Sequence, residues 1–160
     1  MTVFKSKIDP SSEAFAANRA DMLALIDDLH ALKDRARDLS ERRRPRFDER
    51  GQLTPRERLV RLLDPGMPFL ELFSLANYMV DTDERDKSIP GASSLAGIGF
   101  ISGVRCMVFV SDSGINAGAS TAKTGEKYRC CQEIALDKKL PFVQLIESAG
   151  ANLMKYQVEG

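Results

Sequence analysis

The amino-acid sequence predicts an α/β domain whose functional loops lie at the ends of its strands. Two observations carry this prediction: apolar, β-branched runs follow the order strand, strand, helix, strand over residues 96–147, and glycine-rich segments join them. The length of 160 residues fits one domain, and a hydrophobic content of 43% is enough for a packed core. Because the chain stops soon after the last of these strands, we expect the sheet to be unfinished.

The charge balance argues against several classes of function. The 23 basic and 23 acidic residues give a formal net charge of zero, so no overall field attracts nucleic acid or anionic lipid. No apolar run approaches the roughly 20 residues of a membrane-spanning helix, and the first residues lack the pattern of a secretory signal. We therefore expect no nucleic-acid partner, no membrane partner and a cytoplasmic location.

The cysteines indicate free thiols. Cys106, Cys130 and Cys131 are odd in number and lack the C-x-x-C spacing, so neither a disulfide framework nor a four-ligand zinc site is indicated. We expect buried or half-buried thiols and no metal in this chain.

Residues 9–40 are expected to form one long helix. Asp9 and Pro10 supply the N-cap and the first helical position. One apolar stripe recurs at alternating spacings of three and four, at Met22, Leu25, Leu29, Leu32, Ala36 and Leu39. Charged residues fill the other faces, so the helix should pack along a neighbour. That neighbour is the domain itself or another subunit, since the stripe is short for an independent coiled coil.

Pro45 is expected to end this helix within a basic segment, ERRRPRFDERG at residues 41–51. Acidic residues are interleaved with its arginines, which favours a solvated linker and leaves a phosphate or nucleic-acid site as the alternative. The next four residues, TPRE at 54–57, combine an N-cap, a proline and a capping-box glutamate, and so begin a short helix. Residues 64–66, DPG, should end it before an extended run at 69–72.

The second half of the chain carries the sheet. Residues 96–101 and 104–110 are separated by Ser102 and Gly103, the spacing of a two-residue hairpin. A glycine-rich loop at 113–120 precedes a helix over 121–138, and a strand over 142–147 runs directly into residues 148–152, SAGAN. Residues 153–158 should begin another helix.

Three blocks spread over most of the chain carry a family resemblance. They are GQLTPRERLVRLLDPGMPFLEL at 51–72, PGASSLAGIGFISGVRCMVFVSD at 90–112 and QEIALDKKLPFVQLIESAGAN at 132–152. Together they are similar to the carboxyltransferase (β) subunits of biotin-dependent acyl-CoA carboxylases, the methylcrotonyl-, propionyl- and geranyl-CoA carboxylase group. The first block is the most specific.

The resemblance implies a crotonase-like fold of repeated strand-strand-helix turns. Residues 1–50 would be an amino-terminal helical arm and basic linker, and 51–160 the start of a truncated acyl-CoA-binding domain. It implies carboxybiotin and acyl-CoA as cofactor and substrate, with a biotin carboxylase/biotin carrier subunit as partner. It also implies a homo-oligomer, a hexamer built as a trimer of dimers, and the mitochondrial matrix in a eukaryote. Because the biotin-binding half is missing, we expect this fragment alone to be inactive.

The turn at residues 148–152 is the candidate active site. Carboxylation next to a thioester requires an enolate, which fixed N–H donors at a strand-to-helix turn stabilise. Spacing alone favours an ordinary tight turn, whereas the resemblance assigns an oxyanion site to the backbone amides of Gly150 and Ala151. The resemblance further suggests substrate contacts at Ala149, Asn152, Gly118, Ala119 and Lys123. Ala149 departs from the glycine that is commoner in the family.

Several other polar residues are not assigned to the active site. His30, on the charged helix, is expected at the surface, and Glu147 is expected to cap the turn rather than act as an acid or base. Lys123, Lys127 and Arg129 are either solvated or in contact with CoA phosphates. Two rival functions remain: another crotonase-like acyl-CoA enzyme (decarboxylase, hydratase or isomerase), and a non-catalytic assembly module. The acyl group is left open.

Overall fold

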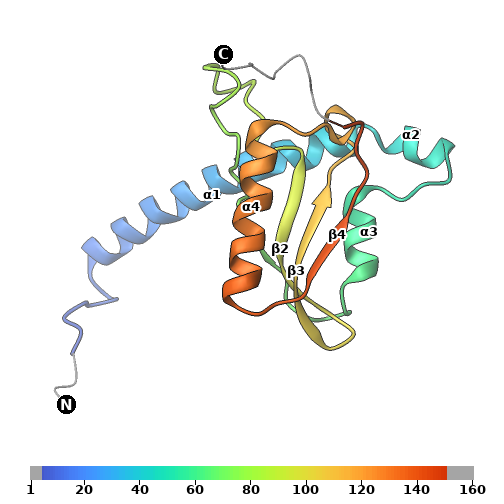
Figure 1. Ribbon diagram of the computed structural model, residues 1–160. Helices are drawn as coiled ribbons and strands as arrows, with labels where there is room; N and C mark the ends of the chain where they lie inside the picture. Colours follow the sequence, from blue (N-terminus) through green and yellow to red (C-terminus); the bar gives the residue numbers. More distant parts are fainter. Residues whose placement is uncertain (1–4, 151–160) are drawn as a thin grey trace, which may run out of the picture.

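A β-hairpin forms the centre of a four-stranded sheet in the computed structural model, which describes residues 5–150 (Figure 1). The strands are β1 (Leu70–Glu71), β2 (Ser94–Ile101), β3 (Val104–Ser111) and β4 (Phe142–Leu145), and they lie in the order β1-β2-β3-β4. β1 and β3 each pair antiparallel with β2, whereas β4 pairs parallel with β3. The predicted order of strand, strand, helix and strand is confirmed, although β4 ends two residues earlier than expected.

The hairpin turn has the backbone expected from its sequence. Ser102 and Gly103 have φ angles of 51° and 77°, both in the left-handed region that a type I′ turn requires. The Asp64 carboxylate accepts the backbone N–H of Ser102 at 2.8 Å and that of Gly103 at 2.7 Å. The DPG element that follows the short helix therefore also binds the hairpin turn.

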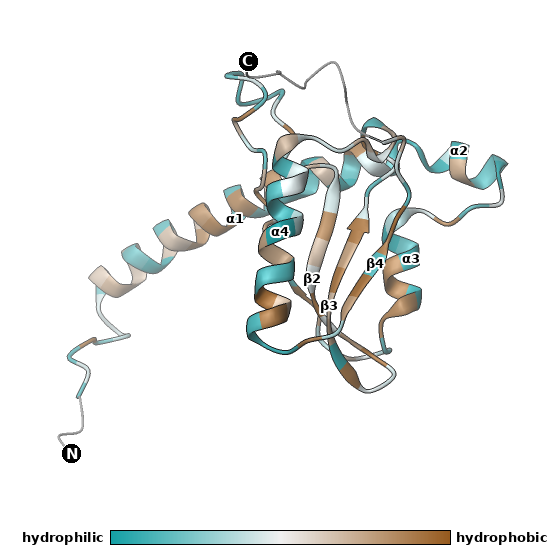
Figure 2. Cartoon of the chain, in the orientation of Figure 1, coloured by the Kyte–Doolittle hydropathy of each residue, from teal (hydrophilic) through white to brown (hydrophobic). Residues whose placement is uncertain are grey.

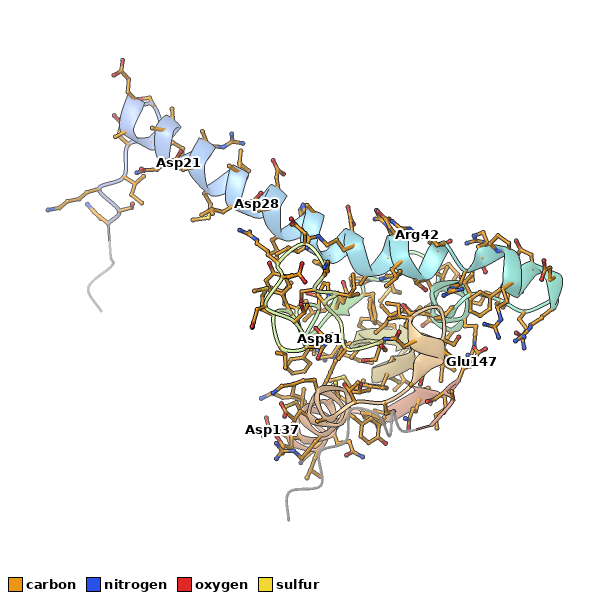
Figure 3. The ribbon with its side chains drawn as sticks, turned by 90° about the horizontal axis from the view of Figure 1, so that it is seen from above. Asp21, Asp28, Arg42, Asp81, Asp137 and Glu147 are labelled. Carbon is orange, nitrogen blue, oxygen red and sulfur yellow. The ribbon has the colours of Figure 1, made fainter. Side chains whose placement is uncertain are left out.

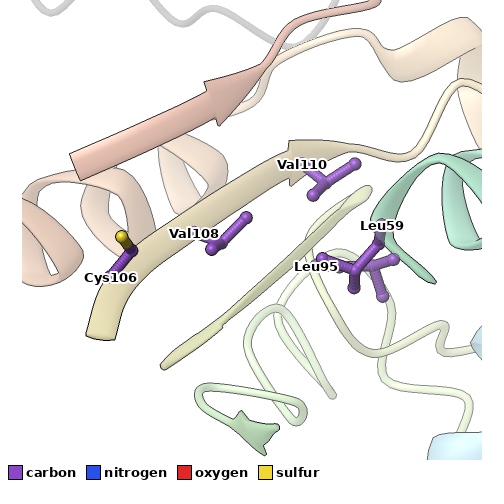
Figure 4. Packing of buried hydrophobic residues seen from close by; sticks show 5 residues of the cluster. All are labelled: Leu59, Leu95, Cys106, Val108 and Val110. Carbon is purple, nitrogen blue, oxygen red and sulfur yellow. The ribbon is translucent and has the colours of Figure 1, made fainter. Parts of the chain in front are cut away.

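The two faces of the sheet bury two separate sets of side chains, because successive residues of a strand point to opposite faces. Helix α3 (Pro55–Leu62) covers one face, where the core is formed by Leu59, Leu95, Cys106, Val108 and Val110 (Figure 4). Helix α4 (Ala122–Asp137) covers the other, where the core is formed by Ala96, Met107, Phe109, Cys131 and Ala135. Figure 2 shows the resulting concentration of hydrophobic residues along β2 and β3. The expectation of buried or half-buried free thiols is confirmed.

Helix α1 (Glu13–Glu41) starts later than its sequence suggested. Ser12 is the N-cap, and its Oγ accepts the N–H of Phe15 at 3.2 Å. The prediction of Asp9 as the cap was wrong, because the Asp9 carboxylate instead accepts the N–H of Ser11 at 2.9 Å in a turn before the helix.

The apolar stripe of α1 contacts the domain only near its carboxyl-terminal end. Ala36 and Ser40 are buried, whereas Met22, Leu25 and Leu29 are 57%, 63% and 38% exposed. The first half of α1 extends away from the sheet (Figures 1 and 3). Packing of that half against another subunit stays a prediction. His30, near the middle of α1, is exposed, as expected.

The basic segment is not simply a linker. Residues 44–49 form helix α2 (Arg44–Glu49), and Pro45 lies in its first turn, where a missing N–H breaks no helical hydrogen bond. Phe47, only 6% exposed, holds α2 against the domain. After α2, Thr54 and Glu57 form the predicted capping box at the start of α3.

Lys127 connects α4 to the loop that enters β2. Its ammonium is buried and donates to the backbone oxygens of Gly91 at 3.1 Å and Ser94 at 2.7 Å. Both sequence-based alternatives for this lysine, a solvated charge and a phosphate ligand, were therefore wrong. Burial lowers the pKa of Lys127 to about 8.

The buried lysine predicts a pH dependence of stability. Between about pH 8 and pH 10 the unfolded chain holds a proton on Lys127 that the folded chain has released, so the free energy of unfolding should rise with pH. The gain is on the order of 3 kcal/mol across the full pKa difference. Urea unfolding of the full-length protein at several pH values measures it. Lys127→Met should remove this rise, and an equal rise in the variant would contradict the assignment.

Among the described residues, no helix combines the length and the apolar character needed to cross a bilayer.

Candidate functional site

Two glycine-containing segments meet beyond the carboxyl ends of β3 and β4. One contains the short 3-10 helix η1 (Asn116–Gly118), and the other is the chain that follows β4. The N–H of Ala149 donates to the Ala117 oxygen at 3.0 Å, and the N–H of Ser120 donates to the Gly150 oxygen at 2.9 Å. These bonds hold together two segments that lie some thirty residues apart in the sequence. We call this contact the loop–turn junction.

Gly118 makes the closest approach within the loop–turn junction. Its φ is 68°, and a Cβ atom added there would collide with the backbone oxygen of Glu147 and lie 3.2 Å from the Cα of Ser148. The Ser148 hydroxyl donates to the Gly118 oxygen at 2.6 Å. Only glycine combines this backbone angle with so short a separation. Gly118 therefore sets the distance between the two segments.

Gly150, one of the two predicted oxyanion donors, lies in the exposed part of this junction. Its φ is 96°, and the position of a side chain at Gly150 is open, with no atom within 4 Å. Its N–H donates to Ser148 Oγ at 3.0 Å, so a ligand oxygen would have to take the place of this hydroxyl. The other predicted donor, Ala151, and the predicted contact Asn152 lie outside the described residues.

The remaining predicted contacts lie on the loop side and on α4. Ala119 directly follows η1, and its N–H donates to the Asn116 oxygen at 3.0 Å. Lys123, in the first turn of α4, pairs with Glu126 at 2.7 Å. The structure thus brings Gly118, Ala149 and Gly150 together, while Lys123 keeps a partner on its own helix.

A cavity of about 250 Å³ opens on the α4 side of the loop–turn junction. Its polar lining includes hydroxyl groups from three segments, and its apolar lining includes two aromatic rings: Ser93, Ser120, Thr121, Ser148, Phe109 and Tyr128. Tyr128 packs edge-on against Phe109, with ring centroids 5.1 Å apart. Neither Ser93 nor Tyr128 was a candidate from the sequence, because no motif there connects the segment before β2 with the middle of α4.

A second cavity, of about 390 Å³, opens on the α2 side of the same junction. Three arginines line it, Arg43, Arg46 and Arg50, together with residues of the loop after β3 and of the turn after β4: Ser113, Gly114, Asn116, Ala117, Glu147, Ser148 and Ala149. We call it the arginine pocket. The sequence carried a signal for it, since these arginines are spaced by three and four residues and so share one helical face.

A buried carboxylate holds the start of the loop against α1. Ser40 Oγ donates to Asp112 at 2.6 Å, and the Gly114 N–H donates to the same oxygen at 3.1 Å. Burial raises the pKa of Asp112. Gly114 is also packed directly against Ser40, leaving no space for a side chain. The end of α1 is therefore part of the support for the loop.

Glu147 does not cap the turn with its side chain. Its carboxylate pairs with Arg58 of α3 at 2.7 Å, and both side chains are half-buried. This ion pair links the TPRER segment of the first sequence block to the ESAGAN segment of the third. The pairing gives Glu147 a positioning role at the end of β4.

Within residues 5–150, no group of three or more His, Cys, Asp or Glu side chains is arranged to hold a metal ion.

Residues 46–160 match the protein family described as Carboxyl transferase domain. Over 114 residues, the chain is 44% identical to the biotin-dependent 3-methylcrotonyl-coenzyme A carboxylase beta1 subunit of Mycobacterium tuberculosis. That alignment covers 71% of this chain and 21% of the relative.

Solved structures of similar fold cover most of the chain. The beta subunit of geranyl-CoA carboxylase from P. aeruginosa superposes with a TM-score of 0.87 and 44% identity, over 96% of this chain and 28% of that one. Transcarboxylase 12S superposes with a TM-score of 0.72 and 26% identity, over 84% of this chain and 26% of that one. The predicted crotonase-like fold is confirmed. The chain spans about a quarter of the length of these proteins.

Proposed function

The chain belongs to the carboxyl transferase domain family, and from this premise we propose that it forms part of the carboxyltransferase (β) subunit of a biotin-dependent acyl-CoA carboxylase. The observation that carries the proposal is the similarity to the geranyl-CoA carboxylase beta subunit, which extends over 96% of this chain at 44% identity. The methylcrotonyl-CoA carboxylase subunit is similar to the same degree over a shorter length. Both names point to carboxyl transfer to an acyl-CoA.

The proposed reaction takes a proton from a carbon conjugated with the thioester carbonyl, transfers it to the biotin nitrogen that has lost its carboxyl group, and joins that carboxyl group to the carbon. Carboxybiotin, carried by a partner, supplies that carboxyl group. Negative charge gathers on the thioester oxygen as the enolate forms, and N–H donors aimed at this oxygen lower the barrier. We assign this role to the backbone amides of Gly150 and Ala151, with the Gly150 N–H exchanging Ser148 Oγ for the thioester oxygen.

The substrate surface is assigned around the loop–turn junction. Gly118, Ala119 and Ala149 would line the approach to the thioester, because small side chains leave the backbone accessible to a ligand. Asn152 is assigned to the same surface by the family resemblance. Lys123 would reach the substrate only by giving up its ion pair with Glu126.

The remaining assignments follow the family. Residues 1–50 would be the helical arm with its basic segment, and 51–160 the beginning of the acyl-CoA-binding domain. A biotin carboxylase/biotin carrier subunit would be the partner, and the chain would assemble as a homo-oligomer. The exposed apolar residues on the first half of α1 support contact with another subunit, since such surfaces commonly mark interfaces.

Calorimetric titration of the full-length protein with a panel of acyl-CoA esters tests the substrate assignment. A carboxyl-transfer assay with carboxybiotin tests the reaction. We expect the complete β subunit, assayed with its biotin-bearing partner, to bind and carboxylate at least one acyl-CoA, whereas this chain alone should not carboxylate any. Binding of esters without carboxylation would favour another crotonase-like acyl-CoA enzyme. Absence of binding to every ester would favour an assembly module and contradict the proposal.

A further inference from the structure

Helix α2 separates its charges onto two faces. Arg43, Arg46 and Arg50 follow each other at spacings of three and four, which places them on one side of the helical turn. The same side carries the buried ring of Phe47, and all four residues line the arginine pocket. The helix therefore places three exposed guanidinium groups around the arginine pocket.

These three arginines have no acidic partner within residues 5–150. Their neighbour Arg44, on another side of α2, differs, because it pairs with Glu41 and Glu57 at 2.8 Å each. The one acidic residue in the lining of the arginine pocket, Glu147, is already paired with Arg58 at 2.7 Å. The pocket thus carries an uncompensated positive charge in a protein whose formal net charge is zero.

The opposite wall of the pocket offers hydrogen-bonding groups. Ser113 lies in this lining, and its Oγ is buried without a hydrogen-bond partner among the described residues. Buried hydroxyl groups are normally paired, so the Ser113 hydroxyl has hydrogen-bonding capacity left for a water or a ligand oxygen. Gln52 and Asn116, which carry amide side chains, belong to the same lining. Arginines facing hydroxyl and amide groups are suited to phosphate oxygens.

We propose that the arginine pocket binds the phosphate groups of the nucleotide part of an acyl-CoA. This inference rests on the proposed function. Ala149 lines the pocket and directly precedes Gly150, so the thioester site and the pocket lie on one continuous surface. A coenzyme A ester has its thioester at one end of a flexible arm and its phosphates at the other. One molecule would then engage both sites, with its arm leading from the turn to α2.

The test compares two triple variants of the full-length protein that lose the same charge. The first is Arg43→Gln, Arg46→Gln and Arg50→Gln, which empties the pocket of positive charge. The matched control is Arg42→Gln, Arg61→Gln and Arg105→Gln, at exposed positions outside the pocket. Each protein is titrated by calorimetry with an acyl-CoA ester and with the matching S-acyl-pantetheine, which lacks the nucleotide and its phosphates.

We expect the first variant to raise the Kd of the acyl-CoA by about 10- to 100-fold, since charge-assisted hydrogen bonds to phosphates are lost. The Kd of the acyl-pantetheine should stay unchanged, as should both values in the control. Ser113→Ala alone should weaken binding of the acyl-CoA by a smaller factor. Equal urea midpoints for the two triple variants would exclude unfolding as the cause.

The outcomes separate this inference from the function on which it rests. If the wild-type protein binds the acyl-CoA and the acyl-pantetheine equally well, and the first variant behaves as the control does, the pocket assignment is overturned while the proposed function stands. If the wild-type protein binds neither compound, both are overturned.

Discussion

Replacing Gly150 with valine is expected to reduce kcat/KM for carboxylation by about 10²- to 10³-fold, the usual effect of removing one donor from an oxyanion site. The reason lies in the backbone. Gly150 has a φ of 96°, a region that β-branched residues avoid, so valine would pull the turn out of this conformation. The Gly150 N–H would then lose the orientation that the proposed oxyanion role requires. Steady-state carboxylation kinetics of the full-length protein, with an acyl-CoA ester that the wild-type protein binds, measures kcat/KM for the wild type and the variant.

The matched control is Gly66→Val. Gly66 also has a positive φ, 76°, and open space at the position of a side chain, but it lies in the turn after α3, outside the loop–turn junction. Backbone strain should therefore be comparable in the two variants, while only Gly150→Val should lose activity. Equal kinetic losses in both would show that strain alone lowers activity and would remove Gly150 from the proposed oxyanion site.

Gly118→Ala is expected to lower the free energy of unfolding by about 2–4 kcal/mol, because a positive φ and an overpacked contact act together. The added methyl group would collide with the Glu147 backbone oxygen, and backbone cannot yield as the end of a side chain can. The collision is removed only if the two segments of the loop–turn junction move apart. This movement breaks the hydrogen bond from Ser148 Oγ to the Gly118 oxygen. Urea denaturation of the full-length protein measures the change, and we expect acyl-CoA binding to weaken with it.

Gly125→Ala serves as the contrasting substitution. Gly125 lies within α4 and has open space around the position of a Cβ atom. Alanine should stabilise the helix there by about 0.5–1 kcal/mol, since it reduces the entropy that the chain loses on folding. If Gly118→Ala were as well tolerated as Gly125→Ala, the tight approach at Gly118 would not control the junction.

Elements with short-range signals were predicted well. The hairpin turn at Ser102 and Gly103 and the capping box between Thr54 and Glu57 depend on residues at most three positions apart. The start of α1 was missed because Asp9 and Ser12 are both good caps, and the choice between them depended on the turn that Asp9 forms with Ser11.

The candidate site was predicted in part. The resemblance pointed to Gly118 and Gly150, and the structure places them on the two bonded segments of one junction. The sequence did not show that the Gly150 N–H is bound by Ser148 Oγ, because this contact depends on how the turn folds back. Lys127 was misinterpreted for a related reason: its position on the helix does not reveal that carbonyl oxygens some thirty residues earlier surround its ammonium.

The sequence by itself determined the family, the order of the apolar strands and the helix between them, and the local turns and most caps, because these depend on motifs or on neighbours along the chain. Only the tertiary structure decided that α2 turns three arginines toward the loop–turn junction and that Arg58 reaches Glu147. These contacts join residues roughly 60 to 100 positions apart in the sequence. Spacing along the chain carries no information about such distances, which are set by how the helices pack on the sheet.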